Sequence, residues 1–239
     1  MRVPKFACRV LSPTLFALLF ILSPLVKADI IHRYSFNGND ASDSVGTANG
    51  TLHGTATVHD GQLFLDGTDM TYVDIPIGAD VGSLLNITVE AWVTWNTNAG
   101  QPWARIFDFG SDTDHNMFLT PMNGNNQRVR FAITVSGGGN EEQTTAIIRF
   151  PVGAETHVVV TLDGDNQVTA IYMNGRPVVI EYGGFLAPLD LGTTTNNYLG
   201  RSQYADPFFN GSINEFRIYN TALSADDVLN SFNAGPDAP

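Results

Sequence analysis

The feature of this sequence that most constrains its fold is the repeated alternation of apolar and polar residues in short runs after residue 29. Successive side chains of a β-strand point to opposite faces, so these runs predict half-buried strands, and the Gly, Asn and Asp residues between them predict turns. Strands are expected at residues 30–36, 62–66, 72–75, 87–95, 105–109, 117–121, 127–135, 144–150, 157–162, 168–173, 176–181, 198–201 and 212–219. Many short strands with such turns predict an all-β sandwich of two antiparallel sheets.

Several neighbouring runs are separated by turns typical of β-hairpins. The predicted hairpins are 62–66 with 72–75, 127–135 with 144–150, and 157–162 with 168–173. One helix is predicted near the C-terminus. Ser224 can cap its first turn, Asp227 stands at the capping-box position, and Leu223 and Val228 have the spacing of a hydrophobic staple. The tail, residues 235–239, is expected to fray.

The N-terminal segment has the features of a secretory signal peptide. Basic residues precede a short apolar core at residues 15–22, and a Val-Lys-Ala sequence ends at Ala28. We therefore predict cleavage after Ala28 and a secreted chain, extracellular or periplasmic, with no membrane span after the leader. An uncleaved N-terminal anchor is the alternative reading.

The composition after this leader, residues 1–28, excludes several classes of partner. The single cysteine, Cys8, is lost with the leader, so the predicted domain at residues 29–234 has no disulfide framework. The chain after the leader, residues 29–239, keeps eight arginines and no lysine against 24 Asp plus Glu, a formal net charge of 8 − 24 = −16. Such a surface repels polyanions, so nucleic acid is an unlikely partner, whereas neutral glycans, divalent cations and proteins remain. The sequence carries no signal for an oligomeric state.

Several stretches, in order, resemble landmarks of the laminin-G-like family within the concanavalin A-like lectin/glucanase superfamily. They are YSFNGNDASDS at 34–44, LDG through YVDIP at 65–76, ITVEAWV at 87–93, THVVVT and IYMNGRP at 156–161 and 171–177, and FNGSINEFRIYN followed by ALS at 209–224. The resemblance implies a two-sheet antiparallel jelly-roll sandwich with one short C-terminal helix. Because one fold hosts lectins, adhesion modules and glycanases, it does not by itself decide the function.

The resemblance also implies a structural calcium ion near the start of the domain. Asn37, Asp40 and Asp43 offer oxygen ligands in a short loop, and Asn214 in the closing strand stands where an acidic residue is common in the family. The alternative is that these residues only form turns, for which Asn and Asp are well suited. A second candidate cation loop is the Asp112–Asn116 segment, for which a solvated loop is the alternative.

A ligand-binding face is predicted on the strand at 127–135. Alternation turns Arg128 and Arg130 away from the core, and Arg149 is expected to join them from the neighbouring strand. Aromatic residues suited to stacking on sugar rings, Trp103, Tyr204 and Phe208, lie in loops or beyond strand ends. The alternatives are pairing of the arginines with nearby acids and burial of the aromatic rings.

No pair of catalytic carboxylates is visible, and we assign no catalytic residue. The central strand carries one acid, Glu90, whereas glycoside hydrolysis needs two. The sequence therefore predicts a secreted, non-catalytic module that binds carbohydrate or an extracellular protein. The alternatives are a glycan-active enzyme, either a hydrolase or a lyase that uses His157 and Tyr172, and a protein–protein adhesion module.

Overall fold

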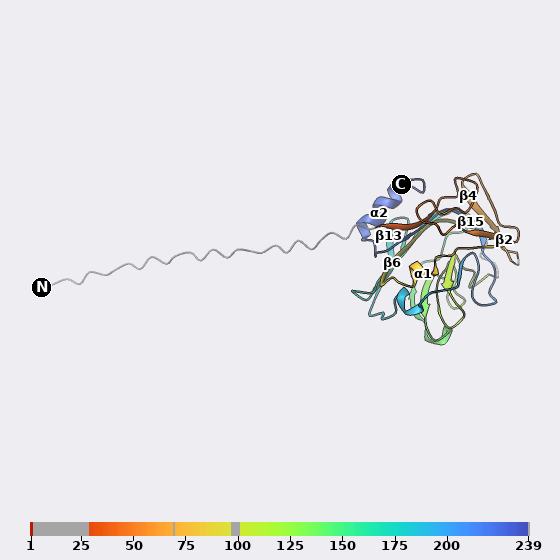
Figure 1. The fold of residues 1–239 in the computed structure, drawn as a ribbon. Coiled ribbons are helices and arrows are strands. Elements are labelled where there is room, and N and C mark those ends of the chain that lie inside the picture. Colours follow the sequence, from red (N-terminus) through yellow and green to blue (C-terminus); the bar gives the residue numbers. More distant parts are fainter. Residues whose placement is uncertain (2–28, 69, 97–100, 239) are drawn as a thin grey trace.

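The computed structural model describes residues 1, 29–68, 70–96 and 101–238, which form an all-β sandwich of two antiparallel sheets (Figure 1). The predicted fold class is confirmed. The predicted leader, apart from Met1, lies outside the described residues. Within the part that is described, no helix has the length and apolar character needed to cross a membrane.

Sheet A contains eight strands in the order β13-β12-β11-β6-β15-β4-β3, with β1 also paired to β15. Its strands are β1 (Ile30–Tyr34), β3 (Thr57–His59), β4 (Gln62–Asp66), β6 (Asn86–Trp95), β11 (Glu155–Asp163), β12 (Val168–Met173), β13 (Arg176–Tyr182) and β15 (Asn210–Tyr219). The long strands β6 and β15 lie side by side at its centre, with a register shift between Ile213 and Glu215.

Sheet B contains seven strands in the order β10-β9-β8-β7-β14-β5-β2. Its strands are β2 (Thr51–His53), β5 (Tyr72–Asp74), β7 (Phe107–Gly110), β8 (Asn116–Thr120), β9 (Arg130–Thr134), β10 (Glu142–Thr145) and β14 (Asn196–Leu199). β8, β9 and β10 are adjacent in this order, so their outward-facing side chains share one face of the sheet.

The main hydrophobic core fills the space between the two sheets, as the alternation in the sequence requires. On β9, Phe131 and Ile133 face this core, whereas Arg130, Ala132 and Thr134 face outward. The same alternation on β6 sends Val89, Ala91 and Val93 inward and Glu90 and Trp92 outward. The polar and charged side chains of these strands therefore lie on the outer face of each sheet.

The predicted C-terminal helix is confirmed as α2 (Ala225–Ala234). The Asp227 N–H donates to the Ser224 hydroxyl at 3.2 Å, and the Asp227 carboxylate accepts from the Ser224 N–H at 3.2 Å, which completes the capping box. Leu223 and Val228 are buried in a second, smaller apolar cluster on the outer face of sheet A. Figure 1 shows α2 beside β13, so the helix covers part of that sheet.

Three short helical turns complete the described elements: α1 (Gly78–Val81), η1 (Gly138–Asn140) and η2 (Pro188–Leu191). They were not expected from the sequence, because none is long enough to show helical periodicity. Two of them matter below, since α1 carries Asp80 and η1 borders the main cavity.

Two of the three predicted hairpins are confirmed, and one is wrong. β9 pairs with β10, and β11 pairs with β12. The runs at 62–66 and 72–75 are strands β4 and β5, but β4 belongs to sheet A and β5 to sheet B. The turn residues between them therefore mark a crossing between sheets, and β4 pairs instead with β3 and β15.

The C-terminal tail makes specific contacts where fraying was expected. The Arg217 guanidinium on β15 donates hydrogen bonds to the backbone carbonyls of Pro236 and Ala238. The Asn37 amide donates to the Asp237 carboxylate at 2.8 Å. Residues 236–238 thus lie against the outer face of sheet A.

Candidate functional site

The main candidate site is a cavity of about 320 Å³ on the outer face of sheet B. Strands β8, β9 and β10 form its floor, and the segments at 103–105, 138–141 and 204–206 form its walls. The lining residues are Trp103, Arg105, Phe118, Asn125, Arg130, Gly138, Glu141, Gln143, Tyr204 and Asp206. Aromatic rings and hydrogen-bonding groups are therefore gathered in one concave site, the usual composition of a small-molecule site.

Phe118 and Arg105 build the floor of the cavity. Phe118 lies on β8 between two core-facing neighbours, so alternation turns its ring to the outer face. The Arg105 guanidinium lies over this ring, 3.7 Å from its centroid. This cation–π contact and its burial hold the guanidinium flat against the floor.

Two carboxylates neutralise Arg105 from either side. Arg105 Nη2 lies 3.1 Å from Asp206 Oδ2, and Arg105 Nε lies 3.4 Å from Asp108 Oδ2. Its Nη1 also donates to the Trp103 carbonyl. Arg105 Nη1 and Nη2 are thus directed at protein groups, and its buried Nε makes an ion-pair contact but no hydrogen bond in the described residues. With its charge balanced by two carboxylates, Arg105 organises the floor rather than offering a free charge.

Arg130 has a different environment, although it is also largely buried. Its Nε donates to the Thr145 hydroxyl at 3.0 Å, and its guanidinium lies 5.5 Å from the centroid of the Trp103 ring. Burial lowers the pKa of Arg130, while the charge of Glu141 opposes this effect. No carboxylate in the described part of the chain lies within ion-pair distance of Arg130, and the residue lines the cavity.

The lining of the cavity also includes an acid, Glu141, and two aromatic residues, Trp103 and Tyr204. Burial raises the pKa of Glu141 above its ordinary value, although the charges of Arg105 and Arg130 oppose the shift. Trp103 adopts a left-handed backbone conformation with φ of 72°, and its N–H donates to the Met122 carbonyl at 2.7 Å. A non-glycine residue held in that region indicates local constraint, which is frequent at binding sites.

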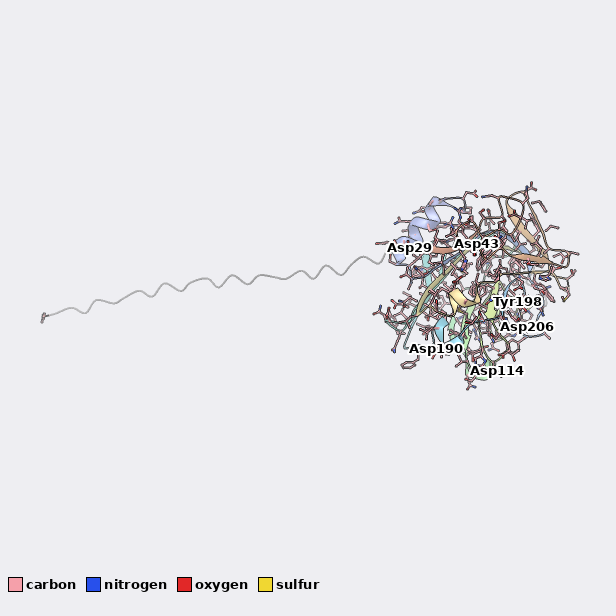
Figure 2. The ribbon with its side chains drawn as sticks, viewed as in Figure 1. Asp29, Asp43, Asp114, Asp190, Tyr198 and Asp206 are labelled. Atoms are coloured by element: carbon pink, nitrogen blue, oxygen red, sulfur yellow. The ribbon has the colours of Figure 1, made fainter. Side chains whose placement is uncertain are left out.

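The loop that carries Tyr204 is tied to the sheet by hydrogen bonds. The Tyr204 hydroxyl donates to the Thr113 carbonyl at 2.7 Å, and the Gln203 N–H donates to Asp108 Oδ2 at 3.0 Å. Figure 2 labels Asp206 in this loop. Burial raises the pKa of Asp108 to about 6, against the opposing charge of Arg105.

The structure brings together three of the six predicted ligand-binding residues. Trp103, Arg130 and Tyr204 all line the cavity. Arg128 precedes β9 and is exposed. Arg149 lines a separate, smaller cavity with Trp95 and Phe150. Phe208 lies near Tyr72, with ring centroids 6.3 Å apart, and belongs to another aromatic group. Arg128, Arg149 and Phe208 thus lie outside this cavity, and their part in ligand binding stays a prediction.

Sequence reasoning missed Arg105, Phe118, Glu141 and Asp206 as lining residues of this site. A usable signal existed for Arg105 and Asp108, since charged residues stood in an otherwise apolar run. Their meeting with Asp206, a hundred residues later, depends on the order of strands in sheet B.

The predicted calcium ligands do not form one site in the structure. Asp43 accepts backbone hydrogen bonds from Arg33, Val45, Gly46 and Ala48, and its Oδ2 lies 2.7 Å from His32 Nδ1. Burial opposes ionisation, but the Arg33 N–H and the other donors hold the pKa of Asp43 below its ordinary value. The carboxylate is therefore committed to shaping its own loop.

The other three predicted ligands have separate partners. The Asn37 amide contacts Asp237, Asp40 accepts from the Ser42 N–H at 3.0 Å, and the Asn214 amide donates to Glu155 at 2.9 Å. Across the described ranges, no group of three or more His, Cys, Asp or Glu side chains is arranged to hold a metal ion. In the structure these residues therefore make turn and surface contacts, and the structural calcium ion stays a prediction.

The second candidate cation loop follows its alternative reading. Asp112 Oδ1 accepts from the backbone N–H groups of Asp114 and His115 at 2.9 and 2.8 Å. This is the hydrogen bonding of a turn, and the side chains of Asp112 and His115 are exposed.

The single acid of the central strand lies on the other sheet, away from the cavity. Glu90 is fully buried on the outer face of sheet A. Its Oε1 lies 2.8 Å from His157 Nε2, and the Tyr219 hydroxyl donates to its Oε2 at 2.6 Å. The Phe232 ring of α2 stacks on His157, 5.6 Å between centroids, and closes this cluster from solvent.

Comparisons with known proteins agree with this architecture. Residues 66–229 match the laminin-G-type family model described as "Concanavalin A-like lectin/glucanases superfamily". Domain 4 of AbnA, a GH43 extracellular arabinanase from Geobacillus stearothermophilus solved in complex with arabinotriose, is 26% identical with a TM-score of 0.72. The similarity covers 85% of this chain and 98% of that domain.

Binding domains of botulinum neurotoxins share the fold at lower identity. The serotype D/C domain is 15% identical with a TM-score of 0.67, and the serotype DC domain in complex with SialylT is 15% identical with a TM-score of 0.63. These similarities cover 86% of this chain but only 52% and 51% of those chains. No curated protein matches the sequence.

Proposed function

The chain belongs to the laminin-G-like family of the concanavalin A-like lectin/glucanase superfamily, and from this premise we propose that it is an exported, non-catalytic module that binds carbohydrate in the sheet B cavity. The observation that carries the proposal is the convergence of Trp103, Tyr204 and Arg130 in one cavity. Aromatic faces stack on the apolar faces of sugar rings, and an arginine fork donates to hydroxyl oxygens.

The charge of the site favours a neutral glycan. The lining holds two arginines, Arg105 and Arg130, and two acids, Glu141 and Asp206, so their formal charges cancel. The whole chain has a formal net charge of −12, and its field opposes the approach of a polyanionic ligand. A neutral oligosaccharide meets donors and acceptors in the cavity without that penalty. Domain 4 of AbnA, with its arabinotriose complex, supports pentose oligosaccharides as the first probes.

The position of Glu90 supports a role without catalysis. A glycosidase needs two carboxylates beside the scissile bond. Glu90 is fully buried under α2 on sheet A, whereas the cavity lies on the outer face of sheet B. The two acids that line the cavity already have protein partners, since Asp206 pairs with Arg105 and Glu141 accepts a hydrogen bond from Gln143.

Isothermal titration with arabinotriose, preceded by a glycan array to find stronger ligands, tests the proposal. Trp103→Ala and Arg130→Ala are each expected to weaken binding at least tenfold. A lost hydrogen bond to a charged group costs about 1.5–3 kcal/mol, and about 1.4 kcal/mol is a factor of ten.

Arg128→Ala is the matched control for Arg130→Ala. Arg128 lies two residues earlier but is exposed and does not line the cavity, so its loss should leave affinity unchanged. Equal losses in both variants would point to general surface charge rather than to the cavity. No glycan bound by the wild-type protein would refute the proposal.

Protein binding is a second candidate function, and one observation favours it. The rings of Tyr182 and Phe185 are 77% and 76% exposed at the edge where β13 approaches β10. Glu142 fixes their loop by accepting from the Phe185 and Leu186 N–H groups at 2.9 and 3.0 Å. If a partner protein is found, Tyr182→Ala with Phe185→Ala should abolish its binding and leave glycan binding intact.

A further inference from the structure

His32 lies at the edge of a second cavity, of about 410 Å³, far from the glycan site in the fold. The cavity lies between β1, the loop at 45–47 and the α1 segment, and it is lined in part by His32, Asp80, Ser83 and Asn220. Figure 2 shows Asp43, which contacts His32, well separated from Asp206 of the first cavity. The His32 residue is only 3% exposed.

The two ring nitrogens of His32 face two different carboxylates. Nδ1 lies 2.7 Å from Asp43 Oδ2, and Nε2 lies 3.3 Å from Asp80 Oδ2. Asp43 already accepts from four backbone N–H groups, which is the behaviour of an ionised acceptor. Nδ1 must therefore donate its hydrogen to Asp43, and in the neutral ring Nε2 carries the lone pair.

This arrangement leaves the Nε2 atom of His32 buried and without a hydrogen-bond partner in the described part of the chain. Its neighbour is the Asp80 carboxylate, which also presents lone pairs. Two acceptors that face each other repel, unless a proton on Nε2 or a metal cation lies between them.

The separation of the two atoms matches the spacing of two ligands of one metal ion. A direct N–H···O bond to oxygen spans about 2.7–3.2 Å. Zinc bonds of about 2.0–2.1 Å to nitrogen and 2.0–2.2 Å to oxygen, at the tetrahedral angle, place the two ligand atoms about 3.3–3.5 Å apart. The observed Nε2–Oδ2 distance is 3.3 Å.

We propose that His32 Nε2 and Asp80 bind a divalent transition metal ion, of which Zn²⁺ is the best fit, with water in the remaining positions. Asp43 holds the ring from behind, the usual arrangement in which a metal-binding histidine donates its other N–H to a carboxylate. The Asp80 side chain is 62% exposed, so the ion can enter from solvent. With two protein side chains the site is of moderate affinity, and its role is to join α1 to β1.

The imidazole nitrogen among its ligands distinguishes this site from a calcium site. Calcium and magnesium prefer oxygen ligands, whereas imidazole nitrogen favours Zn²⁺ and its neighbours in the first transition series. Zinc should therefore act at far lower concentration than calcium.

The test uses the untagged protein in metal-free buffer, with thermal melts and titration calorimetry against ZnCl₂ and CaCl₂. At ten times the dissociation constant, zinc should raise the wild-type midpoint by roughly 3–6 °C. Asp80→Asn keeps the size of an exposed side chain but weakens the ligand, and it should lose most of this shift and at least tenfold in zinc affinity.

Asp60→Asn is the matched control, because His59 Nδ1 and Asp60 form another His–Asp pair at 3.1 Å, with both side chains exposed. This variant should keep the full zinc shift. No zinc-dependent shift in the wild type, or an equal shift in wild type and Asp80→Asn, would overturn the proposal. Glycan titrations of the same proteins are independent of this result, because the cavities share no lining residue.

Discussion

Glu90→Gln is the substitution that separates a structural from a catalytic role for the central strand. Glu90 is fully buried and accepts from Tyr219 at 2.6 Å, with His157 Nε2 at 2.8 Å and Arg217 Nη1 at 3.5 Å. Glutamine keeps the size but removes the charge. It also places an N–H₂ group where the protein presents donors, so one donor must lose its acceptor.

The cost follows from these contacts. Removing one partner of a buried charged network typically costs about 3–5 kcal/mol, because the remaining charge is left without compensation. Glu215 still pairs with Arg217 at 3.0 Å, which limits the loss. We therefore expect about 3 kcal/mol, and a midpoint lowered by roughly 6–12 °C for a domain of this size.

The effect has a defined pH dependence. Burial opposes the charge of Glu90, but hydrogen bonds from His157, Ser231 and Tyr219 hold its pKa below the ordinary value. A carboxyl group whose pKa is lowered on folding stabilises the protein above its unfolded-state pKa and loses that contribution as pH falls. The difference between wild type and variant should be largest near neutral pH and should shrink below about pH 4.

Urea unfolding at several pH values measures the loss of stability and its pH dependence. Glycan titration at low temperature measures the affinity of the same variants. Glu181→Gln, an exposed acid on β13 of the same sheet, is the control and should change stability by less than about 0.5 kcal/mol. Glycan affinity should be unchanged in both variants. A loss below about 1 kcal/mol, or one independent of pH, would refute the reasoning from the buried network. A turnover reaction slowed a hundredfold by Glu90→Gln in folded protein would refute the non-catalytic proposal.

Two further predictions concern the cavity floor and the N-terminus. The pKa of Asp108 is raised to about 6 by burial, so its folded form binds a proton more readily than its unfolded form, and its contribution to stability falls as pH rises from about 4 to 6. Asp108→Asn should remove this pH dependence, which amounts to at most roughly 3 kcal/mol of unfolding free energy. Urea melts of wild type and variant at each pH measure it, and a wild-type stability that rises relative to the variant as pH rises would contradict the prediction. Cleavage after Ala28 predicts an exported protein that starts at Asp29, and an intact mass that retains the leader would exclude it.

Much of the fold could be predicted because strand alternation is a local property. Residues 127–135 show which side chains face the core, and Val129, Phe131 and Ile133 lie there. The capping pattern around Ser224 likewise predicted α2, since a cap is formed by residues three apart. For the same reason, Trp103, Arg130 and Tyr204 could be named as candidates from residue type and position.

Strand order, by contrast, is a non-local property. The residues between β4 and β5 are typical of a hairpin turn, yet β4 pairs with β3 and β15 in sheet A and β5 pairs with β2 and β14 in sheet B. Register also decided which of the arginines reach the cavity. Arg130 lies on β9, whereas Arg128 precedes it and is exposed.

The sequence by itself determined the sandwich class, the C-terminal helix and three residues of the candidate site, because alternation, capping and residue chemistry act over a few residues. Only the tertiary structure decided that Arg105, Glu141 and Asp206 meet above Phe118, and that Asp43 is committed to its own loop and to His32. These contacts join residues far apart in the chain. Their formation depends on which strands lie side by side and on which polar groups are already satisfied when the sheets close, and neither is encoded in any single segment.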